Sequence, residues 1–232
     1  MPPDTRYPDI VEWPAILLTA RLALVTTLIL FIVGTPLAWW LARSRSRAAI
    51  AVEAITAMPL VLPPTVLGFY LLILLSPTST LGSIWVQLTG SALTFSFSGL
   101  VVASVIYSLP FMVQPLQNAF DELGNNSLEA AATLGAGPID RFFNVALPQC
   151  RRGFITAGVM TFAHTVGEFG VVLMVGGNIP EQTRVISIAI YENVETLNYA
   201  QAHALSAGLL LFSFATLITV YAVNRRSPVR VA

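Results

Sequence analysis

The sequence is poor in charge, contains no lysine and has a single cysteine. Charged residues make up 10% of its 232 positions, whereas they make up about a quarter of an ordinary soluble domain. A chain with so little charge cannot cover itself with a hydrated surface, which excludes an ordinary soluble domain. The lone Cys150 excludes an internal disulfide framework and a cysteine-rich metal site. The formal net charge of zero gives no sign of a nucleic-acid partner.

The absence of lysine also excludes a phosphate-binding P-loop, because the G-x-x-x-x-G-K-[ST] pattern requires that residue. The chain is therefore not expected to hold ATP or Mg²⁺ in such a loop. The sequence shows no Ser/His/Asp set, metal-ligand cluster or pair of catalytic carboxylates either. We therefore expect a protein that is not an enzyme and that binds no cofactor or metal itself.

Hydrophobic residues, by contrast, make up 55% of the chain, and its mean hydropathy is +0.74. A helix needs about 20 mostly apolar residues to cross the hydrocarbon core of a membrane. Five stretches reach that length: residues 14–41, 49–75, 99–119, 153–175 and 200–223. Residues 76–98 are rich in Ser, Thr and Gly and are not counted as a span, although a re-entrant or interfacial helix there stays open. We predict an all-α integral membrane domain of five transmembrane helices over residues 14–223.

The arginines predict how these helices are oriented, because cytoplasmic loops carry an excess of basic residues. Nine arginines follow the first, third and fifth stretches, whereas only Arg6 and Arg184 lie in the segments on the opposite side. We therefore expect an extracytoplasmic N-terminal segment, residues 1–13, and a cytoplasmic tail, residues 224–232. The loop of residues 121–152 would also be cytoplasmic. An odd number of spans agrees with this orientation.

The cytoplasmic loop of residues 121–152 has the most specific pattern in the chain. Its residues Asn125, Asn126 and Ser127 are typical of a helix start, and strong helix formers follow them. That helix should stop at Gly135, before a second amphipathic turn over residues 139–145. Two short helices joined by a glycine would form a knob suited to docking into a cleft on another protein.

The spacing of this loop resembles the EAA motif of permease subunits from binding-protein-dependent ABC importers. The motif reads EAA, three residues, G, nine residues, I, one residue, LP, and Val145 is the one departure from it. The resemblance implies the type I importer (MetI-like) permease fold and a loop that couples the membrane domain to an ATPase subunit. The matching positions, which we take as the coupling residues, are Glu129, Ala130, Ala131, Gly135, Leu147 and Pro148.

The same resemblance implies the partners and the location of the chain. They are two copies of an ABC ATPase subunit, an extracytoplasmic oxyanion-binding protein and the lipid of the inner (cell) membrane of a prokaryote. Five spans are too few to enclose a pore comfortably, so we also expect a homodimer with the path on its two-fold axis.

A second pair of motifs bears on the cargo. The sequence GEFG at residues 167–170 resembles permeases of importers for sulfate, thiosulfate, molybdate and tungstate, and NIPEQTR at residues 178–184 is most similar to the molybdate branch. The resemblance implies a subunit that forms the path for molybdate by alternating access. Tungstate, sulfate and thiosulfate stay alternative cargoes, because tetrahedral dianions differ little in shape and charge.

Several residues inside the predicted spans are candidates for the gate or the path. Glu168 is ionisable, and such a group in a membrane span faces a cavity or a partner. His164 lies one turn earlier, so an intrahelical pair with Glu168 is one arrangement to test. Prolines interrupt the hydrogen-bond ladder of a helix, which membrane proteins tolerate where protein or water satisfies the freed groups. A structural role and a gating role both stay open for His164, Gly167, Glu168, Gly170, Pro63 and Pro64.

Two other classes of function are weaker alternatives. A secondary transporter or channel would work without an ATPase and would therefore be active as this chain alone. A membrane-embedded enzyme would need a cluster of buried catalytic groups, and the spans offer only Glu53, His164 and Glu168.

Overall fold

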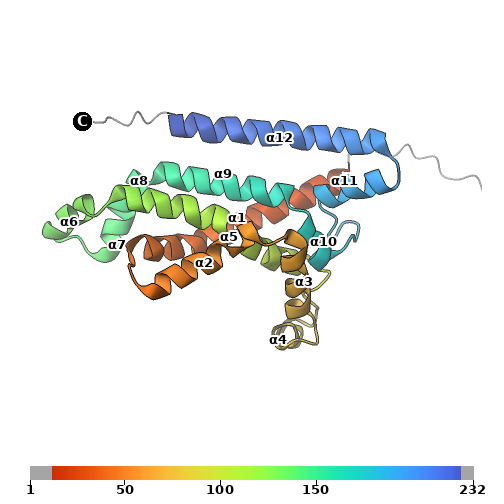
Figure 1. Ribbon diagram of the computed structural model, residues 1–232, viewed down its shortest axis with the longest axis horizontal. Helices are drawn as coiled ribbons and strands as arrows, with labels where there is room; N and C mark the ends of the chain where they lie inside the picture. Colours follow the sequence, from red (N-terminus) through yellow and green to blue (C-terminus); the bar gives the residue numbers. More distant parts are fainter. Residues whose placement is uncertain (1–11, 226–232) are drawn as a thin grey trace, which may run out of the picture.

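The computed structural model describes residues 12–225, and every regular element in that range is helical (Figure 1). The predicted outer segment lies outside the described residues up to residue 11, and so does the predicted tail from residue 226. The helices are α1 Trp13–Arg43, α2 Arg47–Val61, α3 Pro64–Leu75, α4 Thr80–Thr89, α5 Phe97–Leu123, α6 Asn126–Thr133, α7 Pro138–Arg141, the π-helix η1 Phe142–Ala146, α8 Leu147–Gln149, α9 Arg151–Gly167, α10 Gly170–Gly176, α11 Ile186–Glu195 and α12 Tyr199–Arg225.

The centre of the bundle is formed by α1, α5 and α9, which pack along most of their length. Their shared core contains large apolar side chains such as Leu30, Met112 and Phe120, all at most 2% exposed. Small residues bring the helices close together. A Cβ atom at Gly34 would lie 2.9 Å from Cγ of Met112, and one at Gly153 would lie 2.3 Å from Cβ of Ala119. The core thus follows from apolar length combined with glycine at the crossing points.

Two of the five predicted spans are broken rather than continuous. The span predicted over residues 49–75 consists of α2 and α3, and the chain bends by 114° between them. The span predicted over residues 153–175 consists of α9 and α10, with a bend of 60°. Pro63 explains the first break, because proline lacks the backbone donor that a helix needs there. Within the described residues, α1, α5 and α12 are each long and apolar enough to cross a membrane alone. Counted with each bent pair as one span, they give the five spans predicted.

The segment of residues 76–98, left open by the sequence, contains a short capped helix. The side chain of Ser79 accepts a hydrogen bond from the backbone of Gly82 at the start of α4, and Gly90 ends it in the left-handed conformation. Ten residues rise about 15 Å, which is too short to cross a membrane. The segment returns to the bundle where the N–H of Phe95 donates to the carbonyl of Val175 at 2.9 Å.

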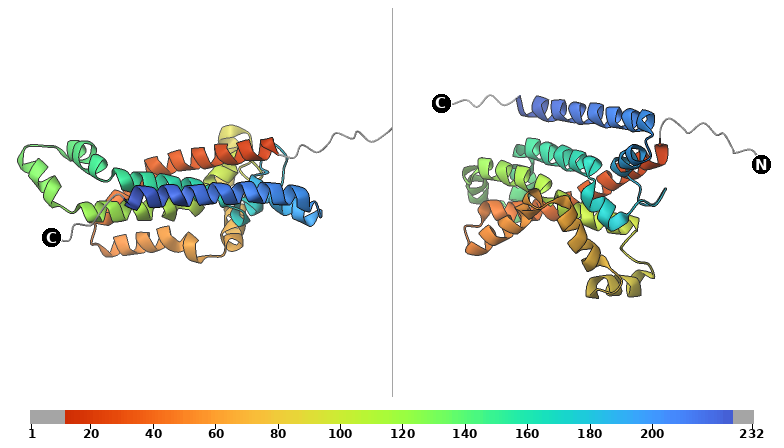
Figure 2. Two further views of the ribbon diagram at one scale, coloured as in Figure 1. Left: turned by 90° about the horizontal axis from the view of Figure 1, so that it is seen from above. Right: turned by 45° about the vertical axis from the view of Figure 1, so that its right-hand side comes forward.

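The last helix, α12, lies along the outside of the bundle. Figures 1 and 2 show it on one side, with α3 and α4 on the opposite side. Its first turns pack against α11 and the start of α1, where Ala202 and Leu205 are buried. Farther along, apolar side chains such as Leu210, Phe214 and Ile218 are more than half exposed. Exposed apolar surface of this kind suits a helix that faces lipid.

Candidate functional site

The two helix breaks meet at one place in the molecule. A Cβ atom added to Gly170, at the start of α10, would lie 2.8 Å from Cβ of Pro64, at the start of α3. One at Gly68 would lie 2.8 Å from Cβ of Met174, so α3 and α10 stay in contact beyond the breaks. We call this region the break junction: residues 62–65 together with residues 167–170.

The backbone of the break junction is extended at both breaks. Leu62, Pro63 and Glu168 have ψ angles of 137°, 133° and 133°. Pro63, Pro64 and Gly167 are exposed on the surface of the chain. Non-helical backbone inside a membrane is stable only where it is covered by protein or lines a water-filled cavity. The structure therefore brings four predicted gate residues, Pro63, Pro64, Gly167 and Gly170, together with the backbone of Glu168.

Glu168 is buried at the break, with 3% of its surface exposed. Its backbone carbonyl, freed by the end of α9, accepts a hydrogen bond from the hydroxyl of Ser187 at 2.5 Å. Both carboxyl oxygens lack a hydrogen-bond partner among the described residues. The hydroxyl of Ser104 on α5 lies beside the carboxyl but out of hydrogen-bonding geometry. A buried polar group without a partner is costly, so this position calls for an explanation.

The intrahelical pair of His164 and Glu168 does not form. The α-helix ends at Gly167, so Glu168 is no longer on the same helical face. Instead, Nδ1 of His164 and the hydroxyl of Ser108 on α5 form a hydrogen bond of 3.0 Å, and the imidazole stacks on Phe111 with centroids 3.8 Å apart. Ser108 also bonds to Thr165 at 2.9 Å. His164 thus ties α9 to α5.

The predicted coupling loop forms a knob of short helices, as expected. Glu129 and Ala130 lie exposed on α6, and Ala131 is half-buried there. Gly135 adopts a φ of +88° after α6, a conformation that side-chain-bearing residues rarely adopt. The second helical segment is longer than the predicted turn, because α7, the π-helix η1 and α8 follow one another without a gap. Leu147 and Pro148 begin α8 at the end of this segment.

The first loop helix begins within the stretch that the sequence predicted, but without a side-chain cap. The helix begins one residue after Asn125, whose side chain makes no cap hydrogen bond. Its amide oxygen instead accepts a hydrogen bond of 3.3 Å from the guanidinium of Arg43, at the end of α1. That guanidinium also lies over the ring of Trp39, 3.6 Å from its centroid. A tertiary contact between the first span and the loop therefore takes the place of a local cap.

Aromatic rings join the loop to the bundle. Phe142 in η1 packs edge-on against Trp39 of α1, and Trp39 packs edge-on against Phe120 of α5, each with centroids 5.0 Å apart. Phe154 of α9 is in turn 5.8 Å from Phe120. Such contacts are directional and worth about 0.5–1.5 kcal/mol each beyond their burial. Packed rings therefore connect the loop to three membrane helices.

The sequence predicted an amphipathic turn over residues 139–145 in this knob, but not which apolar side chains lie on its surface. Leu134 is 89% exposed, Ile139 is 76% exposed and Phe143 is 57% exposed. We call these three residues the loop patch. The sequence signal for it is a set of large apolar residues among polar ones outside any predicted span. The structure adds that no other part of the described chain covers them.

The NIPEQTR segment forms a folded turn between α10 and α11. The carbonyl of Ile179 accepts the backbone N–H groups of Gln182, Thr183 and Arg184. Arg184 donates from Nε to the amide oxygen of Asn178 at 2.8 Å and pairs with Glu192 at 3.2 Å. Among the described residues, no group of three His, Cys, Asp or Glu side chains lies close enough to hold a metal.

Comparison with known proteins decides the family. The family model for the binding-protein-dependent transport system inner membrane component matches residues 34–227. The chain belongs to this family. The resemblance seen in the EAA spacing is thereby confirmed, and the permease includes the coupling loop and both broken spans within the matched range.

Several curated relatives cover most of the permease. The molybdenum transport system permease protein ModB of Azotobacter vinelandii is 58% identical over 211 residues, which are 91% of this chain and 93% of that protein. The protein of the same name from Escherichia coli (strain K12) is 34% identical over 80% of this chain and 81% of its own length. The sulfate transport system permease protein CysT of Salmonella typhimurium is 30% identical over 97% of this chain and 83% of its own length.

Solved structures confirm the predicted fold. A bacterial ABC transporter involved in the import of the acidic polysaccharide alginate matches with a TM-score of 0.68 at 19% identity, over 92% of this chain and 77% of that chain. The MetNI methionine ABC transporter in an inward-facing conformation matches with a TM-score of 0.61 at 20% identity, over 90% of this chain and 94% of that chain. At such low identity the likeness establishes the fold alone. The permease thus has the all-α fold of type I ABC importer membrane subunits.

Proposed function

We propose that the chain is the membrane-spanning subunit of an ATP-driven importer of molybdate. The observation that carries this proposal is the 58% identity to a molybdenum permease, against 30% to a sulfate permease over nearly the whole chain. Tungstate and sulfate stay the rival cargoes, because all three are tetrahedral dianions. The permease supplies the path, and selectivity lies in the extracytoplasmic binding protein.

The proposed assembly is a homodimer with the path on its two-fold axis. In each subunit the exposed surface of the break junction faces that axis, so that Pro63, Pro64 and Gly167 line the path. The extended backbone there needs a wet cavity or a second protein surface, and a path between two copies supplies both. Alternating access is then a shift in population between inward-facing and outward-facing states, driven by ATP binding to the ATPase subunits.

The proposed orientation places the N-terminus outside and the coupling loop in the cytoplasm. It rests on the nine arginines at the loop side against two on the other. The loop patch then meets two ABC ATPase subunits, one for each permease copy, and the folded NIPEQTR turn faces the binding protein. ATP and Mg²⁺ are held by the ATPase subunits alone.

The cargo is tested with the reconstituted complex of permease, ATPase and binding protein. ATP hydrolysis is measured with the binding protein loaded with molybdate, tungstate or sulfate in turn. We expect the largest stimulation with molybdate. Stimulation by sulfate alone would overturn the proposed cargo. Uptake by the permease alone in liposomes, without the ATPase, would overturn the ABC mechanism in favour of a secondary transporter.

The docking role of the loop is tested by charge insertion. In the double variant Leu134→Asp and Ile139→Asp, two apolar side chains that support no internal packing become charged, so the fold should persist while the ATPase subunit is lost during co-purification. Leu197→Asp is the matched control, because Leu197 is 70% exposed and lies beyond the loop. Equal recovery of the ATPase subunit in both variants would exclude the loop patch as the docking surface.

A further inference from the structure

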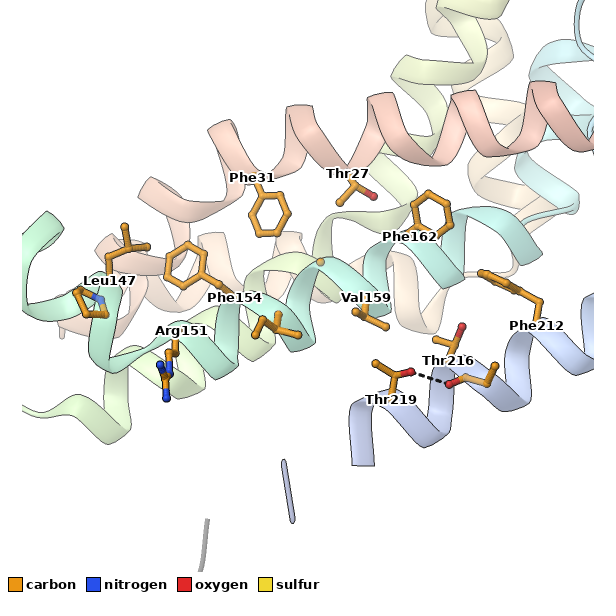
Figure 3. A pocket seen from close by; sticks show the side chains of 14 residues that line it. Thr27, Phe31, Leu147, Arg151, Phe154, Val159, Phe162, Phe212, Thr216 and Thr219 are labelled. Atoms are coloured by element: carbon orange, nitrogen blue, oxygen red, sulfur yellow. Dashed lines mark hydrogen bonds between the residues drawn. The ribbon is translucent and has the colours of Figure 1, made fainter. Parts of the chain in front are cut away.

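An apolar groove lies between α12 and the rest of the bundle. It has a volume of about 950 Å³ and is lined by side chains of α1, α8, α9 and α12 (Figure 3). Its floor is formed where Phe31 of α1 lies on α9 at Gly158, whose added Cβ would be 2.7 Å from the ring. Phe154 stacks beside Phe31 with centroids 6.3 Å apart. Specific packing of α1 on α9 therefore forms the floor of the groove.

The groove is closed at one end and charged at the other. Phe162 and Phe212, with ring centroids 6.2 Å apart, separate it from a smaller cavity of about 450 Å³. That smaller cavity has no charged residue in its lining. The opposite end holds Arg151, which is exposed and also lines an adjoining cavity of about 570 Å³ together with Arg152. The positive charge thus lies only at the end nearest the coupling loop.

The depth of the groove matches one leaflet of a membrane. The α9 helix carries both Arg151 and Phe162, and this separation corresponds to a rise of about 16 Å. Half of a hydrocarbon core about 30 Å thick is about 15 Å. Arg151 therefore lies at headgroup level when the ring pair lies near the middle of the membrane.

The lining of the groove has the same division of charge as a phospholipid. Arg151 is the one charged side chain that lines it, and the other lining residues are apolar apart from Thr27, Thr216 and Thr219. A phospholipid likewise has a charged headgroup at one end and apolar chains along the rest of its length.

We propose that this groove binds an anionic phospholipid of the cytoplasmic leaflet, with its acyl chains along α9 and α12 and its phosphate at Arg151. The leaflet follows from the orientation proposed above, whereas binding itself does not depend on the cargo. Basic pockets between membrane helices on the cytoplasmic side are suited to anionic headgroups, and each arginine near the surface favours an anionic lipid by about fivefold. The bound lipid fills the space between α12 and the bundle and borders Leu147 and Pro148 of the coupling loop.

The test is native mass spectrometry of the full-length permease. The protein is purified in detergent and equilibrated with equal amounts of phosphatidylglycerol and phosphatidylcholine that carry the same acyl chains. We expect retained phosphatidylglycerol to exceed retained phosphatidylcholine several-fold, and Arg151→Gln to lower that ratio by about fivefold. The control is Arg45→Gln, which removes an exposed cytoplasmic arginine outside the groove and should leave the ratio unchanged.

A second pair of variants tests the groove itself. Ala215→Trp places a large ring inside the groove, whereas Leu217→Trp places one on another face of α12. We expect the first to lower retained phosphatidylglycerol severalfold and the second to leave it unchanged. Equal retention of both lipids by the wild type, or equal lipid loss in Arg151→Gln and Arg45→Gln, would overturn the proposal. A change of oligomeric state in Ala215→Trp with lipid retention unchanged would assign the groove to a second copy and overturn it as well.

Discussion

Gly170 lies directly against Pro64, so the breaks of two membrane spans are packed on each other. The Cβ that Gly170 lacks would lie 2.8 Å from Cβ of Pro64, closer than real Cβ atoms approach. Each break frees backbone groups that a continuous helix would satisfy, and the contact holds the two together. The proline ring at one break therefore packs in the space that a side chain would occupy at the glycine of the other break.

This contact predicts the effect of a single methyl group. Gly170→Ala forces α3 and α10 apart and should lower the free energy of unfolding by about 1–3 kcal/mol, as overpacking does in other cores. The control is Gly167→Ala, because an added Cβ there meets nothing within 4 Å. Thermal unfolding of the detergent-solubilised protein measures both. Equal unfolding temperatures for the two variants would show that α3 and α10 can move apart at the break junction without loss of stability.

The sequence was sufficient to predict the spans but not their breaks. Apolar length located the five spans, and Pro63 marked an interruption in the second. The break at Glu168 has no neighbouring proline. Gly167 and Gly170 flank it, but glycine also lies inside unbroken helices, at Gly34 in α1 and Gly208 in α12, so it does not mark a break by itself. That break is stabilised by long-range contacts: the hydroxyl of Ser187, nineteen residues away, satisfies the carbonyl of Glu168, and Gly170 receives Pro64 from another span. Interactions of this kind cannot be found by periodicity.

The coupling loop shows the same limit in a milder form. Its spacing predicted the two helical segments and the glycine between them, because turn chemistry is local. Residues 125–127 predicted the helix start, but the absence of a side-chain cap could not be predicted, because it depends on Arg43 of the first span binding the side chain of Asn125. The members of the exposed loop patch could not be predicted, for a different reason. Whether an apolar residue is covered depends on packing that the sequence does not display.

A second prediction concerns the buried carboxyl of Glu168. Neither of its oxygens has a partner among the described residues, and an ionised carboxylate buried in this way costs several kcal/mol. Glu168→Gln removes the ionisable group at nearly constant shape, so the unfolding temperature should stay the same or rise. Glu122→Gln, at an exposed position, is the control. A loss of about 3–5 kcal/mol in Glu168→Gln alone would instead reveal a buried ion pair with a cation from another subunit.

A third prediction separates docking from transmission within the loop. Phe142 faces Trp39 inside the bundle, whereas its neighbour Phe143 is 57% exposed. Phe143→Ala should weaken binding of the ATPase subunit about tenfold, the loss expected for about 1.4 kcal/mol of apolar contact. Phe142→Ala should leave that binding intact but lower uptake per ATP hydrolysed severalfold, because it interrupts the packed rings. Affinity and coupling ratio are measured on the same preparations. The same defect in both variants would contradict a division of roles.

The last prediction uses Cys150 as a reporter of the joint between the coupling loop and α9. Its side chain is buried, the thiol donates to the carbonyl of Ala119 at 3.2 Å, and burial raises the pKa of the thiol. Because the thiolate is the reactive form, alkylation by iodoacetamide at pH 8 should be slow in the native protein and fast after unfolding. A raised pKa in the folded state also means that this group's contribution to stability is present below the pKa of an unfolded thiol, about 8.5, and is lost as the pH rises further.

The matched control for this measurement is Gln149→Cys in a Cys150→Ala background, because Gln149 is exposed and adjacent in sequence. Its thiol should react at least tenfold faster than that of the native protein at pH 8, since neither burial nor the contact with Ala119 protects it. Unfolding in detergent and denaturant should bring the two rates together, which separates protection by structure from protection by sequence. Equal rates in the native state would mean that Cys150 is accessible and that the joint opens faster than alkylation proceeds.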